Sequence, residues 1–252
     1  MTVDPAAVGL AVAQDPTLAS AIQYLRDHGF AVSSNRAREW CTTQAESGVL
    51  DAQFTMGVML SLGLFGENDS AAARRWYQSA ADLGHPAALL MLANFIEAGS
   101  NEEPPNPQLA LSLVQDSAEK GYAPAMADIA IVYLEGIKLE KNRDIAWKYL
   151  GRAANLGDRQ SQYIYGADLL KDTSIEVINE GIYWLMTAAK GGYAGAHRHL
   201  GYLYSSGRKG LSSDKERAEY HFSMASEIEN SAIEEITTFA DFGANNDSST
   251  LN

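Results

Sequence analysis

Ser117 and Lys120 are the residues whose types and spacing come closest to a catalytic pair. They stand in the S-x-x-K pattern, which places a serine nucleophile and a lysine one helical turn apart in hydrolases of cell-wall and β-lactam-like substrates. Neither companion pattern, S-D-N or K-T-G, follows in the chain. Equivalent positions elsewhere hold Ala80 and Ala153, which favours a packing role for Ser117. A hydrolase using Ser117 and Lys120 is therefore the alternative hypothesis, and a protein that is not an enzyme is preferred.

No cofactor and no metal site are predicted. His197 and His199 are two residues apart, so on a helix they point to different faces and do not form the i, i+4 pair of a zinc helix. The sequence contains no G-x-G-x-x-G, no P-loop and no H-E-x-x-H pattern. Cys41 is the only cysteine, which excludes an internal disulfide and fits a reducing compartment. We interpret it as a small buried thiol.

A repeat of about 36 residues organises the chain around these positions. Turn glycines recur with steps of 36, 37, 36 and 35 at Gly48, Gly84, Gly121, Gly157 and Gly192. Such a period indicates a stacked array of supersecondary units.

Five further columns keep a fixed offset from the turn glycine. Eight positions before it stands a large residue: Trp40, Trp76, Leu113, Tyr149 and Trp184. Eleven before it the residue is small: Ala37, Ala73, Ala110, Ala146 and Gly181. Three before it the residue is always alanine: Ala45, Ala81, Ala118, Ala154 and Ala189. Four after it comes Ala52, Ala88, Ala125, Ser161 or Ala196, and nine after it Gly57, Ala93, Ala130, Gly166 or Gly201.

Small residues at these spacings predict paired helices. Residues three to five apart lie on one helix face, where small side chains let a second helix approach closely. The segment after each turn is the first helix of a pair, and the segment around each large residue is the second. One pair cannot bury its apolar face alone, so neighbouring pairs supply the core.

Composition and charge narrow the class of protein. The 252 residues are 46% apolar, with much alanine, which favours helices over strands. No apolar run approaches the roughly 20 residues of a membrane-spanning helix, and the first residues lack a basic leader. We therefore expect a cytoplasmic protein, or a periplasmic one if a signal peptide has been removed. A net charge of −13 argues against nucleic-acid binding and favours basic partners, unless the acidity serves solubility alone.

The repeat columns predict four segments. Residues 1–34 form N-terminal capping helices with a degenerate repeat, and residues 35–229 form the repeat array. A C-terminal capping helix covers residues 230–242, followed by a disordered tail at 243–252. The acidic, proline-rich loop at 99–107 is the most distinctive connection, and its last proline is placed to open the next helix.

The columns resemble Sel1-like repeats, which are related to the tetratricopeptide family. The similarity is clearest in ADIAIVYLEGIKLEKNRDIAWKYLGRAANLGD, residues 127–158, and in GIYWLMTAAKGGYAGAHRHLGYLYSSG, residues 181–207. This resemblance implies an all-α fold, an α-solenoid of stacked antiparallel helix pairs with a right-handed superhelix. It also implies a non-catalytic scaffold for protein–protein interaction, such as an adaptor, regulator or immunity-type protein.

In related solenoids the first helix of each pair lines a concave groove, and there we expect a helix or extended peptide of another protein, with basic surroundings, to bind. The predicted contact residues lie at positions that the repeat leaves free: Phe54, Val58, Leu90, Asn94, Glu97, Ile131, Leu134, Tyr163, Arg198 and Tyr202. Phe54, Leu90 and Tyr163 occupy a column where such repeats often keep a packing residue, so core packing is an open alternative for those three.

Overall fold

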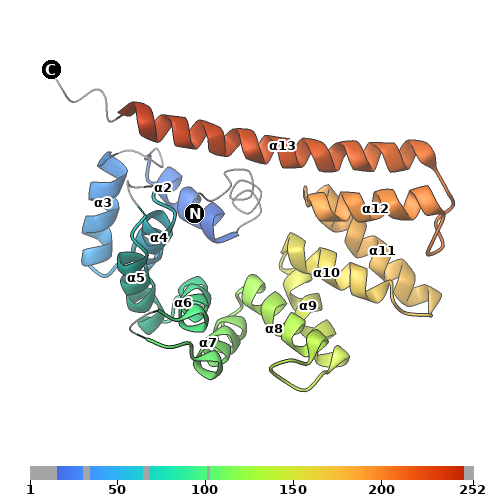
Figure 1. The fold of residues 1–252 in the computed structure, drawn as a ribbon, viewed down its shortest axis with the longest axis horizontal. Coiled ribbons are helices and arrows are strands. Elements are labelled where there is room, and N and C mark those ends of the chain that lie inside the picture. Colours follow the sequence, from blue (N-terminus) through green and yellow to red (C-terminus); the bar gives the residue numbers. More distant parts are fainter. Residues whose placement is uncertain (1–15, 31–34, 65–67, 101–102, 247–252) are drawn as a thin grey trace. The chain divides into compact units, whose positions relative to one another are not determined.

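The computed structural model describes residues 16–30, 35–64, 68–100 and 103–246, with side chains as far as Ser231. These ranges contain twelve helices and no strand (Figure 1). The helices are α2 (Pro16–Asp27), α3 (Asn35–Glu46), α4 (Leu50–Ser61), α5 (Ser70–Asp82), α6 (Pro86–Ala98), α7 (Pro107–Glu119), α8 (Ala123–Glu135), α9 (Arg143–Asn155), α10 (Arg159–Leu169), α11 (Ile175–Lys190), α12 (Ala194–Ser206) and α13 (Lys215–Asn246). The predicted all-α architecture is confirmed.

The chain divides into two compact units, and each is described by itself. The first comprises Met1–Gly121 and Ile233–Asn252, and the second comprises Tyr122–Ala232. In the first unit α4 packs on α5, α5 on α6 and α6 on α7, while in the second α8 packs on α9, α9 on α10 and α10 on α11. Consecutive helices are therefore neighbours, as stacked helix pairs require.

The turn glycines end each pair in the way that the repeat predicts. Gly84 and Gly121 have φ of +85° and +93°, a left-handed conformation that only glycine adopts without strain. The amide of each donates to the alanine three positions earlier, at 2.8 Å for Gly84 and 3.1 Å for Gly121. Side-chain caps then start several second helices: Asn142, for example, accepts a hydrogen bond from the amide of Ile145. Local sequence thus sets both ends of these helices.

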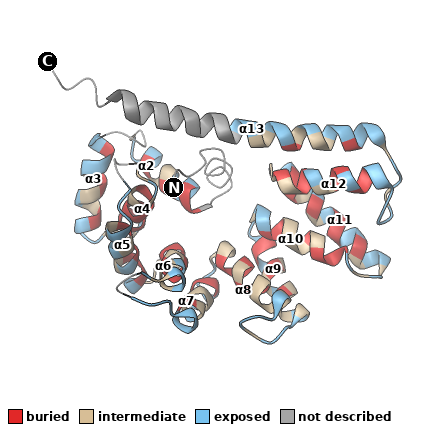
Figure 2. Cartoon of the chain, in the orientation of Figure 1, coloured by how far each residue is buried: buried red, intermediate tan, exposed pale blue. Residues whose placement is uncertain are grey.

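The small columns form the core, and the large column does not. Ala73, Ala146 and Ala118 are fully buried, as the spacing predicts. The large residues eight before the turn are only half-buried. The residue that follows each of them is the buried one in four repeats: Cys41, Tyr77, Leu150 and Leu185. In Figure 2 buried and exposed residues alternate along the helices, as expected when one face lies in a core.

Helices α10 and α11 approach each other closely at a glycine pair. A Cβ atom on Gly181 of α11 would lie 2.8 Å from the carbonyl oxygen of Gly166 on α10, and one on Gly166 would lie 2.8 Å from the carbonyl oxygen of Gly181. Both positions belong to small columns in the sequence. Backbone atoms cannot move aside as a flexible side chain can, so this contact requires glycine on both helices.

The C-terminal region differs from the predicted segment boundaries. Residues 230–242 continue α13, which runs unbroken from Lys215 to Asn246, and do not form a separate capping helix. Residues 1–15 and 247–252 lie outside the described residues, so the N-terminal cap and the tail predicted for them stay predictions, whereas residues 243–246 of the predicted disordered tail belong to α13. In the loop at 99–107, Glu103 pairs with Arg74, and Pro107 is the first residue of α7 as predicted.

Candidate protein-binding face

Ser117 is placed in the core by the fold. Its side chain is fully buried, and its Oγ donates to the carbonyl oxygen of Pro86 at 2.7 Å. Lys120 lies at the end of the same helix, with Nζ 3.9 Å from a carboxylate oxygen of Asp116. A nucleophile must reach its substrate, and this hydroxyl reaches only a backbone carbonyl. The arrangement therefore gives no support to the serine hydrolase hypothesis.

Three of the predicted contact residues are core residues. Phe54, Val58 and Leu90 are 3%, 2% and 4% exposed. The ring of Phe54 stacks on His85 with 4.5 Å between centroids, which fixes it against α6. The prediction that these three side chains contact a partner does not hold in this structure, because neighbouring helices already cover them. The packing alternative accounts for Phe54 and Leu90.

The other predicted residues are at least partly accessible. In the first unit Asn94 and Glu97 are exposed on α6. In the second unit Ile131 and Leu134 are half-buried on α8, and Leu134 packs against the core cluster of Ala130, Ala146 and Leu150. Tyr163 on α10 is half-buried, and Arg198 and Tyr202 on α12 are exposed. The accessible positions thus concentrate in the second unit.

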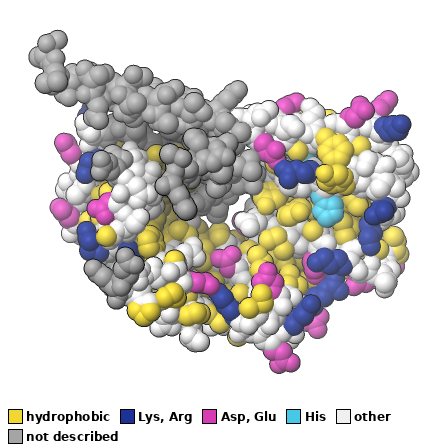
Figure 3. Space-filling view, viewed as in Figure 1, with side chains coloured by type: hydrophobic (Ala, Val, Ile, Leu, Met, Phe, Trp, Pro, Cys, Tyr) yellow, Lys and Arg dark blue, Asp and Glu magenta, His cyan; other side chains and the backbone are white. Residues whose placement is uncertain are grey.

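An aromatic surface surrounds these positions on α10, α12 and α13. The ring centroid of Tyr163 lies 5.2 Å from that of Tyr193 and 6.1 Å from that of His199. Tyr202, with 61% of its surface exposed, meets Phe222 edge to face at 5.2 Å. We call these five residues the aromatic face. Figure 3 shows a histidine among hydrophobic side chains near α12, with lysine and arginine side chains around them.

The electrostatic character of this face is close to neutral. Arg198 forms an ion pair with Glu229 of α13, so its charge is compensated within the fold. Burial lowers the pKa of His199, which favours the neutral imidazole. Burial also raises the pKa of Tyr193, so its hydroxyl stays protonated. A surface of large aromatic rings, next to an arginine whose charge is already compensated, suits an apolar or amphipathic protein segment better than a charged small molecule.

Sequence reasoning did not select Tyr193, His199 and Phe222. Tyr193 follows the Gly192 turn directly, and Phe222 sits on α13, beyond the columns used to define the groove. The density of aromatic residues between Tyr193 and Tyr204 was the available signal. The repeat columns could not show which aromatic rings the fold brings together.

Comparison with known proteins identifies the repeats. The Sel1 repeat family matches residues 50–85, 86–122, 123–158 and 194–229, which together make up more than half of the chain. The chain belongs to the Sel1 repeat family. The match does not include residues 159–193, the segment that contains α10 and α11.

Two curated relatives of this Sel1 repeat chain come from Schizosaccharomyces pombe. Chitin synthase regulatory factor 4 is 30% identical over 136 residues, which is 54% of this chain and 21% of the relative. Chitin synthase regulatory factor 3 is 24% identical over 200 residues, or 73% of this chain and 21% of the relative. The chain therefore spans about a fifth of the length of the curated relatives that it matches.

Solved structures show the same architecture. A Sel1 repeat protein from Oxalobacter formigenes has a TM-score of 0.70 at 26% identity, covering 85% of this chain and 88% of that one. A protective antigen of uropathogenic Escherichia coli with an SLR fold has a TM-score of 0.69 at 25% identity, covering 85% and 46%. An immunity protein from Pseudomonas aeruginosa, 18% identical with a TM-score of 0.58 over 86% and 84% of the chains, shares the fold. The chain is an α-solenoid of Sel1 helix pairs.

Within the described residues no helix is long and apolar enough to cross a membrane. In the same ranges no group of three or more His, Cys, Asp or Glu side chains is arranged to hold a metal ion. The thiol of Cys41 is buried, and burial raises its pKa to about 12, which keeps it protonated and unreactive at neutral pH.

Five positions after the turn glycine, three of the five repeats carry a polar residue, whereas the other two have Leu89 and Met126. In these three repeats a side-chain N–H group of that residue donates to the column alanine at the end of the preceding helix: Gln53 to Ala45 (3.2 Å), Gln162 to Ala154 (3.1 Å) and His197 to Ala189 (3.0 Å). Carbonyl groups at helix ends lack a partner within the helix, so this contact satisfies one of them. His197 thus has a packing role that glutamine fills in two other repeats.

His197 also joins α12 to α13. Its Nε2 carries the proton that the Ala189 carbonyl accepts, so its Nδ1 accepts from Nδ1 of His221 at 2.9 Å. The ring of His221 stacks on Tyr204 with centroids 5.6 Å apart. Burial lowers the pKa of both histidines, and for His221 the nearby charges of His197 and Arg217 lower it further. The two imidazoles cannot both be protonated without losing their shared hydrogen bond.

We expect acid to weaken this contact. A histidine with a lowered folded-state pKa stabilises the fold above its unfolded value of about 6.5, and this contribution is lost as the pH falls below that value. Each such histidine lowers the free energy of unfolding by up to about 1.4 kcal/mol per pH unit in that range. Denaturant titrations between pH 7.5 and 5.5 measure this loss.

His197→Gln is the matched variant, because glutamine makes the same carbonyl contact at residues 53 and 162. We expect its free energy of unfolding at pH 7.5 to lie within about 1 kcal/mol of the wild-type value. Between pH 7.5 and 5.5 this variant should lose less stability than the wild type. His28→Gln, at an exposed position between α2 and α3, is the histidine-to-glutamine control outside this pair. Equal pH dependence in wild type and His197→Gln would contradict the assignment to this pair.

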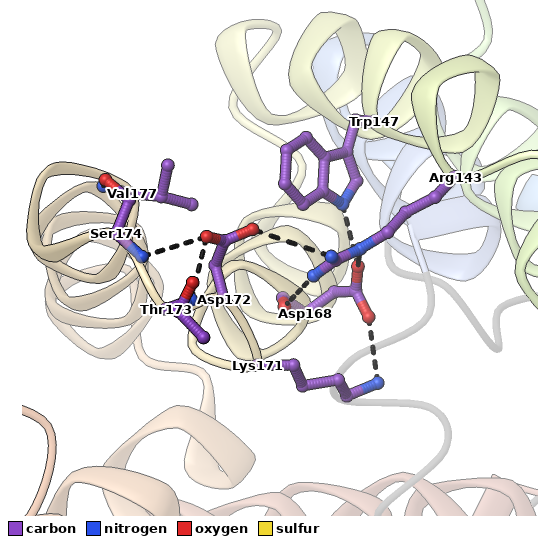
Figure 4. A network of polar contacts seen from close by, with 8 residues as sticks. All are labelled: Arg143, Trp147, Asp168, Lys171, Asp172, Thr173, Ser174 and Val177. Carbon is purple, nitrogen blue, oxygen red and sulfur yellow. Dashed lines mark hydrogen bonds and ion pairs between the residues drawn. The ribbon is translucent and has the colours of Figure 1, made fainter.

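A second polar network holds the α10–α11 loop (Figure 4). Asp168, 5% exposed, accepts hydrogen bonds from Arg143 Nε at 2.9 Å, Trp147 Nε1 at 2.7 Å and Lys171 Nζ at 2.8 Å. Arg143 also lies 3.6 Å from Asp172, whose carboxylate accepts from the backbone amides of residues 173 and 174. Burial alone would raise the pKa of Asp168, but the three donors outweigh it and hold that pKa below its usual value. The network ties α9 and α10 to the start of α11.

Proposed function

We propose that this Sel1 repeat chain is a non-catalytic adaptor or regulator that binds a helix or extended peptide of another protein on the aromatic face. The observation that carries the proposal is the exposed ring of Tyr202. Phe222 packs edge to face against this ring, and the nearby Arg198 is paired with Glu229. Exposed aromatic side chains held by packing lose little conformational entropy on binding, which makes them effective anchors.

The relatives support a regulatory role of this kind. Two of them are named as chitin synthase regulatory factors, and this chain corresponds to about a fifth of their length. A repeat segment of that size within a longer regulator suits a docking module. For this chain we therefore propose the class of function, protein recognition, and leave the recognised protein to experiment.

Charge supports a partner with basic surroundings. The first unit carries 6 lysine and arginine residues against 18 aspartate and glutamate residues, a formal charge of −12, whereas the second carries 13 against 14. A partner with basic residues beside its apolar segment would gain from long-range attraction to the chain as a whole, whose net charge is −13. Long-range attraction of this kind raises the association rate and weakens with added salt.

Substitution of Tyr202 by glutamate is expected to weaken partner binding by about tenfold or more, because the charge removes an anchor and must be desolvated. The partner is first identified by affinity purification and mass spectrometry, and its affinity for each purified variant is then measured by calorimetry. Melting temperature and helicity of Tyr202→Glu should stay close to the wild-type values, since the ring is mostly exposed.

Leu156→Glu provides the matched control. Leu156 is 63% exposed at the end of α9 and is not one of the five residues of the aromatic face, so it accepts a charge equally well and should not alter binding. Wild-type affinity in a folded Tyr202→Glu protein would refute the proposed site. Equal losses in Tyr202→Glu and Leu156→Glu would point to a general charge effect instead.

A further inference from the structure

The exposed side of α11 carries three large apolar residues beside the polar Asn179 and Lys190, and the proposed function does not use it. Ile175, Tyr183 and Met186 are 52%, 61% and 41% exposed, and they follow one another at helical spacing with Glu176 and Glu180 beside them. Single exposed hydrophobic residues are ordinary on a protein surface, but three on one helix face form a patch. We call these five residues the α11 patch.

The other repeats provide an internal comparison. Nine positions before the turn, where this repeat has Tyr183, the others have the exposed residues Glu39, Arg75, Ser112 and Lys148. Six positions before the turn, where it has Met186, the others have Thr42, Gln78, Gln115 and Gly151. Helices in the same position within a pair thus fold with polar or small residues there, so the fold does not require Tyr183 and Met186. This is also the segment that the Sel1 match leaves out.

The patch is held in place by hydrogen bonds and ring contacts. Glu180 Oε1 accepts from Trp184 Nε1 at 3.3 Å and from the hydroxyl of Tyr165 at 3.5 Å. Tyr183 contacts Trp184 edge to face, with 5.3 Å between ring centroids. Tyr165 lies in turn 6.0 Å from Trp184. A carboxylate and aromatic rings are therefore fixed side by side before any partner arrives, which reduces the entropic cost of binding.

The charges of the patch define the partner that it fits. Neither Glu176 nor Glu180 has a basic partner among the residues that the structure describes, and Oε2 of Glu180 accepts no hydrogen bond there. A carboxylate next to aromatic rings favours arginine or lysine, by ion pairing and by cation–π contact. A second copy of this chain, with its net charge of −13, is disfavoured by repulsion.

We propose that the α11 patch is a second docking surface, which binds a basic amphipathic helix of a partner protein. Apolar residues of that helix pack on Ile175, Tyr183 and Met186, and an arginine or lysine one turn away pairs with Glu180. This surface lies on the second helix of its pair, whereas Tyr202 lies on the first helix of the next pair. The proposal is therefore independent of binding at the aromatic face.

The test uses a defined probe and the full chain. The probe is a fluorescein-labelled amphipathic helical peptide of leucine, alanine and arginine, and a matched peptide carries glutamate in place of arginine. Fluorescence anisotropy measures their affinity for the wild type and for Tyr183→Ser/Met186→Gln, which installs residues found in the same columns of other repeats. We expect the double variant to bind the basic peptide about tenfold more weakly, and the acidic peptide not to bind either protein.

Two further variants separate this surface from others. Glu180→Gln should weaken binding several-fold and reduce its salt dependence, because it keeps the hydrogen-bond acceptor and loses the charge. Tyr202→Ser, on the aromatic face, should leave peptide affinity unchanged. Equal binding by wild type and the double variant would overturn the proposal. So would concentration-dependent dimerisation in sedimentation that the double variant abolishes, since a second copy would then be the occupant.

Discussion

Replacing Asp168 with alanine is expected to lower the free energy of unfolding by about 3 kcal/mol, the largest effect that we predict for a single residue. The carboxylate is buried and satisfies Arg143, Trp147 and Lys171 at once. Its loss leaves the indole N–H group without that acceptor, whereas the guanidinium of Arg143 keeps a hydrogen bond to the backbone carbonyl of residue 168 at 2.9 Å and the more distant carboxylate of Asp172. Because Arg143 and Lys171 are partly exposed, water recovers some of this loss.

Denaturant titration of wild type and variant measures the difference, and Asp144→Ala provides the control. Asp144 is an exposed acidic residue in the first turn of α9, where its removal should cost only about 0.5 kcal/mol. The difference between wild type and Asp168→Ala should also shrink in acid. A carboxyl with a lowered pKa stabilises the fold above its unfolded value of about 3.9, and this contribution disappears as the pH falls through the folded pKa. A difference that is constant down to pH 2 would contradict this account.

Replacing Gly181 with alanine is expected to destabilise the fold by about 2 kcal/mol, although alanine has the higher helix propensity. The new methyl group would meet the carbonyl oxygen of Gly166 at 2.8 Å and Cβ of Leu169 at 3.1 Å. Relief requires α10 and α11 to separate, which opens the core around Leu185. Thermal and denaturant unfolding of the variant measure the cost.

Gly151→Ala is the matched control for this substitution. Gly151 also lies within a helix of the second unit, but the nearest atom to an added Cβ is a ring carbon of Tyr165 at 3.6 Å, an ordinary contact. Without a clash, the propensity gain should stabilise the protein by up to about 1 kcal/mol. If both substitutions change the stability in the same direction, the close helix approach is not what makes glycine necessary at position 181.

Much of the fold was predictable because it depends on local rules repeated many times. The turn glycines and the alanine columns predicted where helices end and which faces pack, and Gly84, Ala73 and Ala118 confirm this. The predicted separate helix at 230–242 was wrong, since α13 continues through it without a turn glycine to stop it. Loss of the repeat signal predicted where the array ends, but it gave no information on whether the helix itself ends there.

The candidate site was less predictable than the fold. Counting positions from the alanine column selected Phe54 and Tyr202 equally, yet one is in the core and the other is exposed. The difference comes from what packs beside each helix: Phe54 is covered by His85 and its neighbours, whereas Tyr202 meets Phe222 edge to face and keeps 61% of its surface exposed. The position of a residue in the repeat sets the direction in which its side chain leaves the helix. It does not determine which neighbouring residues the side chain meets there.

The sequence by itself determined the family, the helix pairs, and the burial of small residues such as Ser117, because each follows from a spacing of a few residues within one repeat. Only the tertiary structure decided which side chains meet across repeats. Three examples are the pair of His197 and His221, the donors around Asp168 and the rings around Tyr163. Each joins helices whose contacts depend on packing between neighbouring repeats. The tertiary structure also decided the role of Ser117 in the Ser117–Lys120 pattern. Its side chain is buried, and its hydroxyl donates a hydrogen bond to a backbone carbonyl.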